Sequence, residues 1–223
     1  MGLIKELNLE TYEVIVEKFY SGAISDILDD MGYRNQALDP SIRPINNRLK
    51  VVGKAMTMMA IDVFECPEER YVLELKAMDQ IKEGEVIVVS TNFSKRTCFW
   101  GELLTTASKV KGARGAVMDS YTRDTKKILE VEFPLFTTGF SPIDSAGRSE
   151  VINYNCHIEI GGVSIDPGDF VFGDIDGVVI IPSAIAVEVI NKAYDKIIGE
   201  NKVREALLGG MSVSDAYNKY HIL

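Results

Sequence analysis

A short polar segment that could bind an anion and a metal follows a buried strand predicted over Gly115–Asp119. It ends in Arg123 and Asp124, where a helix is predicted to begin and to run to Val131. Open α/β sheets bind ligands outside the carboxyl ends of such strands. An arginine can hold a carboxylate through two hydrogen bonds, and an aspartate is a hard oxygen ligand for Mg²⁺ or Mn²⁺. The alternative is a helix-capping aspartate beside a surface arginine.

A second candidate segment, Gly101–Leu104, opens a helix predicted to reach Lys111. The first amides of a helix have no internal partners, and the helix dipole attracts anions to that end. A glycine at the start permits close approach of a ligand. In the alternative interpretation, Gly101 only turns the chain and Glu102 only favours the helix dipole.

Other chemistries have little support. The chain has no Gly-x-Gly-x-x-Gly after a strand, no Walker A motif and no Gly-x-Ser-x-Gly elbow. His157 falls in a predicted strand and His221 lies close to the last residue, so neither indicates catalysis. Lys54 is the candidate for a Schiff-base aldolase, but a flanking glycine and a position at a sheet edge explain it more simply. An enzyme here would therefore use carboxylates, arginine, backbone amides and a metal.

Composition excludes several classes of protein. The net charge of -9 disfavours non-specific binding to nucleic acid. No apolar run approaches the roughly 20 residues needed to span a bilayer. Residues 1–6 lack the features of a signal peptide, so we expect a cytoplasmic protein without membrane contact. Three widely spaced cysteines are typical of reduced thiols: Cys66, Cys98 and Cys156.

Helical and strand patterns alternate in the middle of the chain, and strands cluster late. This order predicts an α/β fold with a mixed central sheet flanked by helices, in one domain over residues 1–223. Expected helices cover Leu9–Phe19, Ala23–Met31 with Ser21 as N-cap, Glu68–Met78, Ser183–Leu208 with a candidate break at Gly199, and Val213–Tyr220. Expected strands cover Leu49–Ala60, Glu85–Ser90, Gly115–Asp119, Phe133–Thr138 and a β-rich stretch from Val151 to Pro182.

Taken together, the two polar segments resemble a known signature. The stretch GELLTTASKVKGARGAVMDSYTRD is similar to that of the RraA-like family, which contains the class II 4-hydroxy-4-methyl-2-oxoglutarate aldolases. SGAISDILDDMG resembles the family's N-terminal helix, and its late strands are matched by Gly161-Gly162-Val163, Pro167-Gly168-Asp169 and Gly173–Val179. The resemblance implies a swivelling-domain-like α/β/α core in a homotrimer or homohexamer.

The resemblance also implies roles for residues. The pyruvate carboxylate would be bound by Arg123 and by the amides of the helix start: Gly101, Glu102, Leu103 and Leu104. Asp124 would hold the divalent metal, Mg²⁺ or Mn²⁺, and Glu102 would act on it through water. Glu200, on the C-terminal helix, would reach the site of a neighbouring subunit. Family members commonly have Gly where Ser120 stands, and we expect the serine to narrow the pocket.

The implied activity is that of a metal-dependent lyase. Such an enzyme cleaves 4-hydroxy-2-oxo acids to pyruvate in a retro-aldol reaction and decarboxylates oxaloacetate through the same pyruvate enolate. The alternative is a non-catalytic, protein-binding regulator of RNA degradation, because the founding family member inhibits an endonuclease and lacks the full Arg-Asp pair. The presence of Arg123, Asp124 and Glu102 together favours an enzyme whose partners are a small 2-oxo acid and copies of itself.

Overall fold

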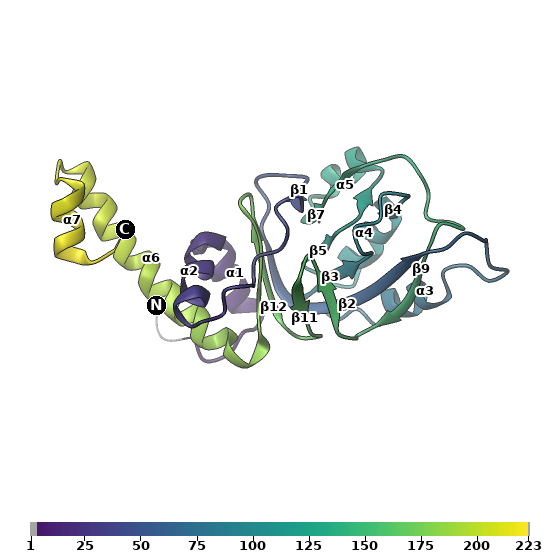
Figure 1. The fold of residues 1–223 in the computed structure, drawn as a ribbon, viewed down its shortest axis with the longest axis horizontal. Helices are drawn as coiled ribbons and strands as arrows, with labels where there is room; N and C mark the ends of the chain where they lie inside the picture. The colour runs from purple at the N-terminus through teal and green to yellow at the C-terminus, as the bar shows by residue number, and fades with distance from the viewer. Residues whose placement is uncertain (1–3, 223) are drawn as a thin grey trace.

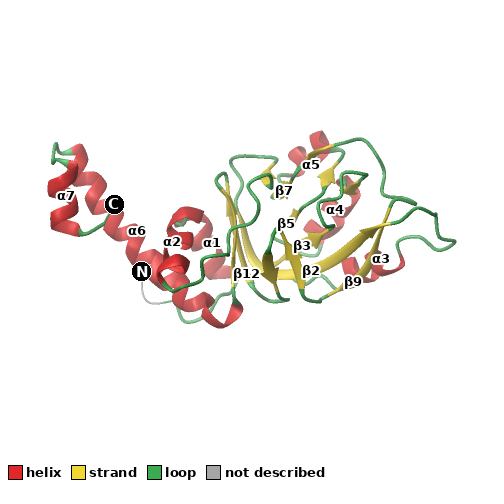
Figure 2. Cartoon of the chain, viewed as in Figure 1, coloured by secondary structure: helices red, strands yellow, loops and turns green. Residues whose placement is uncertain are grey.

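A mixed β-sheet forms the body of the molecule in a computed structural model that describes residues 4–222 (Figures 1 and 2). Residues 1–3 and residue 223 are outside the part of the chain that the structure describes. The strand order is β1-β7-β5-β3-β2-β12-β13, and β9 pairs with the distal part of β2. The strands are β1 (Arg43–Pro44), β2 (Val51–Asp62), β3 (Glu85–Ser90), β5 (Gly115–Met118), β7 (Leu135–Thr137), β9 (Ser149–Tyr154), β12 (Phe170–Asp174) and β13 (Gly177–Ile181).

The centre of the sheet is parallel, because β2, β3, β5 and β7 pair in that direction. Parallel strands are buried on both faces and therefore read as continuous apolar runs. The buried segments Val86–Val89 and Gly115–Met118 have this pattern, as predicted. The outer strands β1, β9, β12 and β13 pair antiparallel. The predicted α/β class with a mixed central sheet is thus confirmed.

The sheet curls until its two ends nearly meet. Arg43 in β1 donates from Nη1 to the carbonyl of Asp176, 2.6 Å away, beside the start of β13. The hairpin β10 (Ile158–Ile160) and β11 (Val163–Ile165) adds apolar side chains to the cluster that the inner faces of the strands form. The interior of the sheet is therefore a packed core.

Helices cover the outside of the sheet in two groups (Figure 1). Side chains from α3 (Val72–Asp79), α4 (Glu102–Val110) and α5 (Thr125–Val131) pack on the outer faces of β3, β5 and β7. The first two helices and the last long helix pack on β12 and β13; they are α1 (Leu9–Lys18), α2 (Ser21–Asp30) and α6 (Ala186–Leu208). Among residues 4–222, no helix combines the length and the hydropathy needed to cross a membrane.

Two predicted helix starts were wrong. Ser21 is the first residue of α2 and Tyr20 is its N-cap, because the Ser21 amide and hydroxyl instead bond the carboxylate of Asp174 at 2.9 and 2.7 Å. The helix predicted from Glu68 begins only at Val72. The preceding residue, Tyr71, has φ 62, a left-handed conformation that interrupts a right-handed helix.

The candidate break at Gly199 is also wrong, since α6 is continuous from Ala186 to Leu208 after a 3₁₀ turn at Ser183–Ile185. The final helix α7 (Val213–Tyr220) folds back along α6, and a side chain at position 199 would collide with Ile222. The glycine therefore allows close packing of the two helices. This helical pair projects away from the sheet (Figure 1).

Candidate active site

A small parallel sheet holds the two polar segments against each other at the carboxyl ends of the central strands. It consists of β4 (Cys98–Trp100), β6 (Tyr121–Thr122) and β8 (Gly139–Phe140), and the last two directly follow β5 and β7. The carbonyl of Trp100 accepts hydrogen bonds from the Thr122 hydroxyl and the Arg123 amide, each at 3.0 Å. Gly101 and the start of α4 are thereby fixed beside Arg123.

A pocket of about 210 Å³ opens at this junction. It lies among α3, β4, the start of α4 and the start of α5. The lining contains every residue that the sequence suggested for the site within one chain: Gly101, Glu102, Leu103, Leu104, Arg123 and Asp124. It also contains residues that no sequence motif marks as functional, chiefly Tyr71, Glu74 and Asp144.

Arg123 is held by two carboxylates. Its Nη1 lies 3.0 Å from Oδ1 of Asp144, and its Nε lies 3.7 Å from Oδ2 of Asp124. The Arg123 side chain remains 38% exposed. Because a guanidinium carries five N–H groups, the ion pair leaves donors available to a ligand in the pocket. Asp144 orients the arginine from a loop between β8 and β9, which has no sequence motif.

Asp124 occupies the N-cap position of α5, but its side chain does not cap that helix. Its φ of 57 is left-handed, and its side chain accepts no hydrogen bond from α5. Oδ2 instead lies 3.4 Å from the amide of Glu102, and a Cβ at position 101 would come within 3.0 Å of it. Glycine at position 101 therefore makes room for this carboxylate, which is half exposed and free to face a cation.

The donor set fits a metal that keeps most of its water. Residues 4–222 contain no group of three or more His, Cys, Asp or Glu side chains arranged around a common metal position. That excludes a closed structural site within the described chain, which would need four protein ligands. Mg²⁺ is commonly bound by one or two carboxylates, several waters and the substrate, and Asp124 can supply such a carboxylate. Glu102 lies beside it and accepts a hydrogen bond from Thr106 at 3.0 Å.

Glu74 is the unexpected carboxylate of the pocket. Only 8% of the residue is exposed, and it forms no hydrogen bond or ion pair with another described residue. Burial, and secondly the negative charge of Asp144, raise the pKa of Glu74 to about 7. At neutral pH this carboxyl is therefore divided between its protonated and ionised forms.

Glu74→Gln should change how stability depends on pH. A carboxyl whose pKa is higher in the folded than in the unfolded chain stabilises the fold below its unfolded pKa, and this contribution is lost as pH rises through the folded value. In metal-free buffer, the variant should therefore gain up to about 3 kcal/mol relative to the parent between pH 4.5 and pH 8. Urea unfolding across this range measures the difference in the free energy of unfolding between variant and parent. If that free-energy difference did not vary with pH, the raised pKa of Glu74 would be contradicted.

Comparison with known proteins identifies the family. A sequence profile of the RraA-like family, described as Aldolase/RraA, matches residues 21–180, which include both polar segments and the main sheet. This chain belongs to the RraA-like family. The match ends before α6, so the C-terminal helical pair lies outside it.

The RraA-like relatives carry different functional names. Protein DlpA of Legionella pneumophila is 30% identical over 90% of this chain, which spans only 32% of DlpA. A 4-hydroxy-4-methyl-2-oxoglutarate aldolase of Thermus thermophilus is 27% identical over 70% of this chain and 90% of its own length. The crystal structure of Streptomyces coelicolor RraAS2, described as an unusual member of the RNase ES inhibitor RraA protein family, aligns with a TM-score of 0.78. Its identity is 27%, and the alignment covers 90% of this chain and 99% of that one.

Ser120 was expected to narrow the pocket, but it is not among the residues that line it. It is fully buried between β5 and β6. Its hydroxyl accepts a hydrogen bond from the Phe99 amide at 3.3 Å. The serine therefore supports β4 from behind, and the expectation that it narrows the pocket directly is wrong.

Two further expectations need correction. Lys54 is exposed, but it lies in a central strand and pairs with β3 and β12, so it is not at a sheet edge. His157 lies one residue before β10, with Nδ1 2.8 Å from Asp166 and away from the pocket. Within its own chain, Glu200 lies 3.7 Å from Lys196 Nζ and outside the lining of the pocket, and its role in a neighbouring subunit stays a prediction.

Proposed function

We propose that this chain is a divalent-metal-dependent lyase that cleaves 4-hydroxy-2-oxo acids to pyruvate and decarboxylates oxaloacetate. The observation that carries the proposal is the convergence of Arg123, Asp124 and the N-terminus of α4 on one pocket. The aldolase name of the Thermus relative agrees with it.

Arg123 and the start of α4 would bind the carboxylate of the 2-oxo acid. Both supply positive electrostatic potential, and the guanidinium is pre-oriented by Asp144. Binding there directs the keto group towards Asp124, whose carboxylate lies 3.7 Å from Arg123 Nε. The substrate is therefore oriented before reaction.

Asp124 would hold Mg²⁺ or Mn²⁺, and Glu102 would contact the ion through a water molecule. When bound, such an ion supplies Lewis-acid polarisation of the substrate's keto oxygen. Asp124 would contribute a carboxylate ligand, and its position is set by the hydrogen bond from the neighbouring Arg123 amide to the Trp100 carbonyl. The negative charge of the carboxylate favours the cation over water alone.

The chain's own residues would then manage charge and protons. In the aldol reaction the C4 hydroxyl would pass its proton to the water molecule held by Glu102, and the C3–C4 bond would break, giving an aldehyde and a pyruvate enolate. Arg123 stabilises the negative charge of the enolate. A water held by Glu102 returns a proton to C3, which completes pyruvate. With oxaloacetate, carbon dioxide leaves C3 instead, so one site serves both reactions.

A substrate screen tests this function. Purified protein should release pyruvate from 4-hydroxy-2-oxo acids and from oxaloacetate with Mg²⁺ or Mn²⁺, and EDTA should abolish the release. Borohydride with pyruvate should trap no covalent adduct, because the mechanism needs no lysine. Covalent trapping at Lys54 would contradict the proposal, as would turnover that is insensitive to EDTA.

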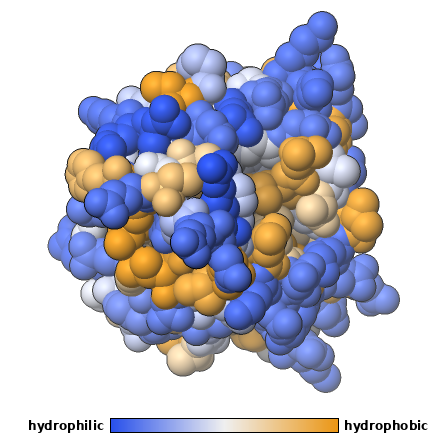
Figure 3. All heavy atoms as spheres, turned by 90° about the vertical axis from the view of Figure 1, so that its right-hand side faces the viewer, coloured by the Kyte–Doolittle hydropathy of each residue, from blue (hydrophilic) through white to orange (hydrophobic). Residues whose placement is uncertain are grey.

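A protein-binding regulator of RNA degradation is the second candidate, favoured by the similarity to RraAS2. The end of the molecule near α3 and β9 shows apolar side chains among hydrophilic ones (Figure 3). Leu103 and Phe140, close to the pocket, are 78% and 61% exposed. No turnover with any 2-oxo acid in saturating metal, together with stable binding of an endonuclease, would favour this function.

We further propose that the site is completed by a neighbouring subunit in a homotrimer or homohexamer. The α6–α7 pair projects from the body (Figure 1). The Glu200 side chain on α6 is 20% exposed, and its burial raises the pKa of its carboxyl. Glu200→Gln should lower kcat/KM at least about tenfold through loss of a charge near the substrate, whereas Glu205→Gln, on the exposed face of α6, should not. Sedimentation should show an oligomer, and a fully active monomer of 24.7 kDa would contradict this arrangement.

A further inference from the structure

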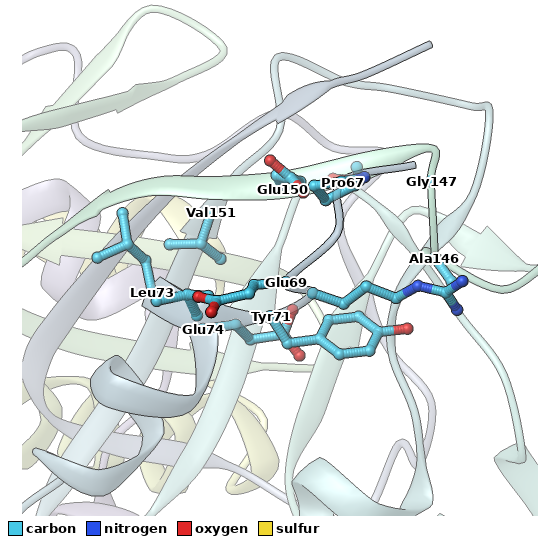
Figure 4. Close-up of a pocket in the computed structure, with 12 residues that line it drawn as sticks. Pro67, Glu69, Tyr71, Leu73, Glu74, Ala146, Gly147, Glu150 and Val151 are labelled. Carbon is cyan, nitrogen blue, oxygen red and sulfur yellow. The ribbon is translucent and has the colours of Figure 1, made fainter. Parts of the chain in front are cut away.

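A second cavity of about 250 Å³ adjoins the pocket that contains Arg123. Tyr71 and Glu74 line both, so the two spaces meet along the start of α3. Figure 4 shows Glu69, Tyr71 and Glu74 on the side of α3, and Glu150 on the strand opposite. A ligand bound by Arg123 could therefore extend past Glu74 into the second cavity.

This second cavity is acidic. Three carboxylates, those of Glu69, Glu74 and Glu150, line it together with one cation, Arg70. Carboxylates accept hydrogen bonds readily, but they repel another carboxylate at short range. The acidic lining contrasts with the first pocket, where Arg123 and the helix N-terminus favour an anion.

Glu74 gives independent evidence for a ligand. More than nine-tenths of the residue is buried, yet no other residue between 4 and 222 bonds its carboxyl group. Its carboxyl oxygens are still reached from the cavities, because Ser108 Oγ is the one fully buried side-chain polar atom without a partner among residues 4–222. The exposed part of this carboxyl faces the cavities that it lines, where a bound hydroxyl group would supply the missing hydrogen bond.

We propose that the second cavity binds the substrate's tail beyond C4, and that this tail is uncharged and hydroxylated. The inference rests on the proposed lyase function. It assigns the substrate to the 3-deoxy-2-oxo acids derived from sugar acids, whose tails carry hydroxyl groups. It also predicts a different preferred substrate from the one in the name of the Thermus aldolase, because 4-hydroxy-4-methyl-2-oxoglutarate carries a second carboxylate on C4.

The reaction balances for such a substrate. The C4 hydroxyl gives its proton to the water molecule held by Glu102, the C3–C4 bond breaks, and the electron pair of that bond remains on the pyruvate enolate. C4 departs as an aldehyde that carries the hydroxylated tail, and one proton returns to C3. Oxaloacetate stays compatible with the site, since its second carboxylate is C4 itself and does not reach the tail cavity.

A matched pair of substrates tests the inference. 4,5-Dihydroxy-2-oxopentanoate and 4-hydroxy-2-oxopentanedioate differ only at C5, which is a hydroxymethyl group in one and a carboxylate in the other. Retro-aldol cleavage of both releases pyruvate, so one assay measures both values of kcat/KM. We expect the hydroxymethyl substrate to be preferred at least about tenfold, the ratio that a difference of about 1.4 kcal/mol gives.

Glu150→Gln separates the charge of the cavity from the rest of the site. Glu150 lines the second cavity and not the first. The variant should therefore reduce the preference for the hydroxymethyl substrate at least threefold, mainly by raising kcat/KM for the carboxylate substrate. Glu17→Gln is the control, because it removes the same charge from the exposed side of α1. It should leave the ratio unchanged.

The outcomes distinguish the two proposals. Equal or better cleavage of the carboxylate substrate would overturn the inference and leave the lyase function intact. An unchanged ratio in Glu150→Gln would also overturn it. If neither compound nor oxaloacetate releases pyruvate in saturating metal, the lyase function fails and the inference fails with it.

Discussion

Arg123→Ala is expected to lower kcat/KM for oxaloacetate by about a hundredfold, roughly 3 kcal/mol, as for a charge pair that loses one partner. The arginine would bind the substrate carboxylate and also stabilise the enolate, so kcat and kcat/KM should both fall. Its side chain is 38% exposed, which argues against a larger loss. Steady-state release of pyruvate at saturating metal measures the effect.

Arg123→Lys distinguishes charge from geometry. Lysine keeps the positive charge but loses the planar fork that meets Asp144 and the substrate together, so only part of the loss should be recovered. Arg48→Ala, which removes an exposed arginine at the opposite end of the strands, should behave like the parent. If Arg123→Ala raised only KM and lysine substituted fully, the residue would capture anions without acting on the enolate. Unchanged kinetics would exclude the proposed site.

The main elements of the fold were predictable because their patterns are long. Buried runs in β3 and β5 and the amphipathic helices around them contain enough residues to show a period. The strands β4, β6 and β8 have only two or three residues each and no readable period. They form because the chain segments after β3, β5 and β7 meet in space, and this pairing is non-local. The small sheet that positions the site could therefore not be predicted.

The same distinction holds for the pocket. Gly101, Arg123 and Asp124 stand at recognisable junctions between strands and helices, so their chemistry is visible in the sequence. Glu74 is one carboxylate in an ordinary helix and Asp144 is one in a loop, and only the packing of α3 against these junctions gives them a role. Ser120 was misinterpreted because its side chain direction depends on the turn from β5 into β6. The residues next to Ser120 in the sequence do not reveal that direction.

Asp124→Asn should abolish metal-dependent turnover while leaving the fold intact. Asparagine is the better test than alanine because φ at this position is 57, where Ala costs about 1 kcal/mol and Asn is tolerated. The change removes the charge that would attract the metal and keeps the shape of the side chain. We expect kcat in saturating Mg²⁺ to fall about a thousandfold, roughly 4 kcal/mol, the scale of lost Lewis-acid catalysis.

Two measurements separate loss of metal from loss of structure. Titration with Mn²⁺, followed by electron paramagnetic resonance, should show binding to the parent and weakened binding to Asp124→Asn, with melting temperatures within a few degrees. Glu132→Gln is the matched control, because it removes one charge from a left-handed residue at the other end of α5. If Asp124→Asn bound Mn²⁺ as tightly as the control and kept its turnover, the ion would have to be held elsewhere. Glu74, Glu102 and Asp144 would then be the carboxylates left to hold it, and a metal on Asp144 would compete with Arg123 for the same oxygen.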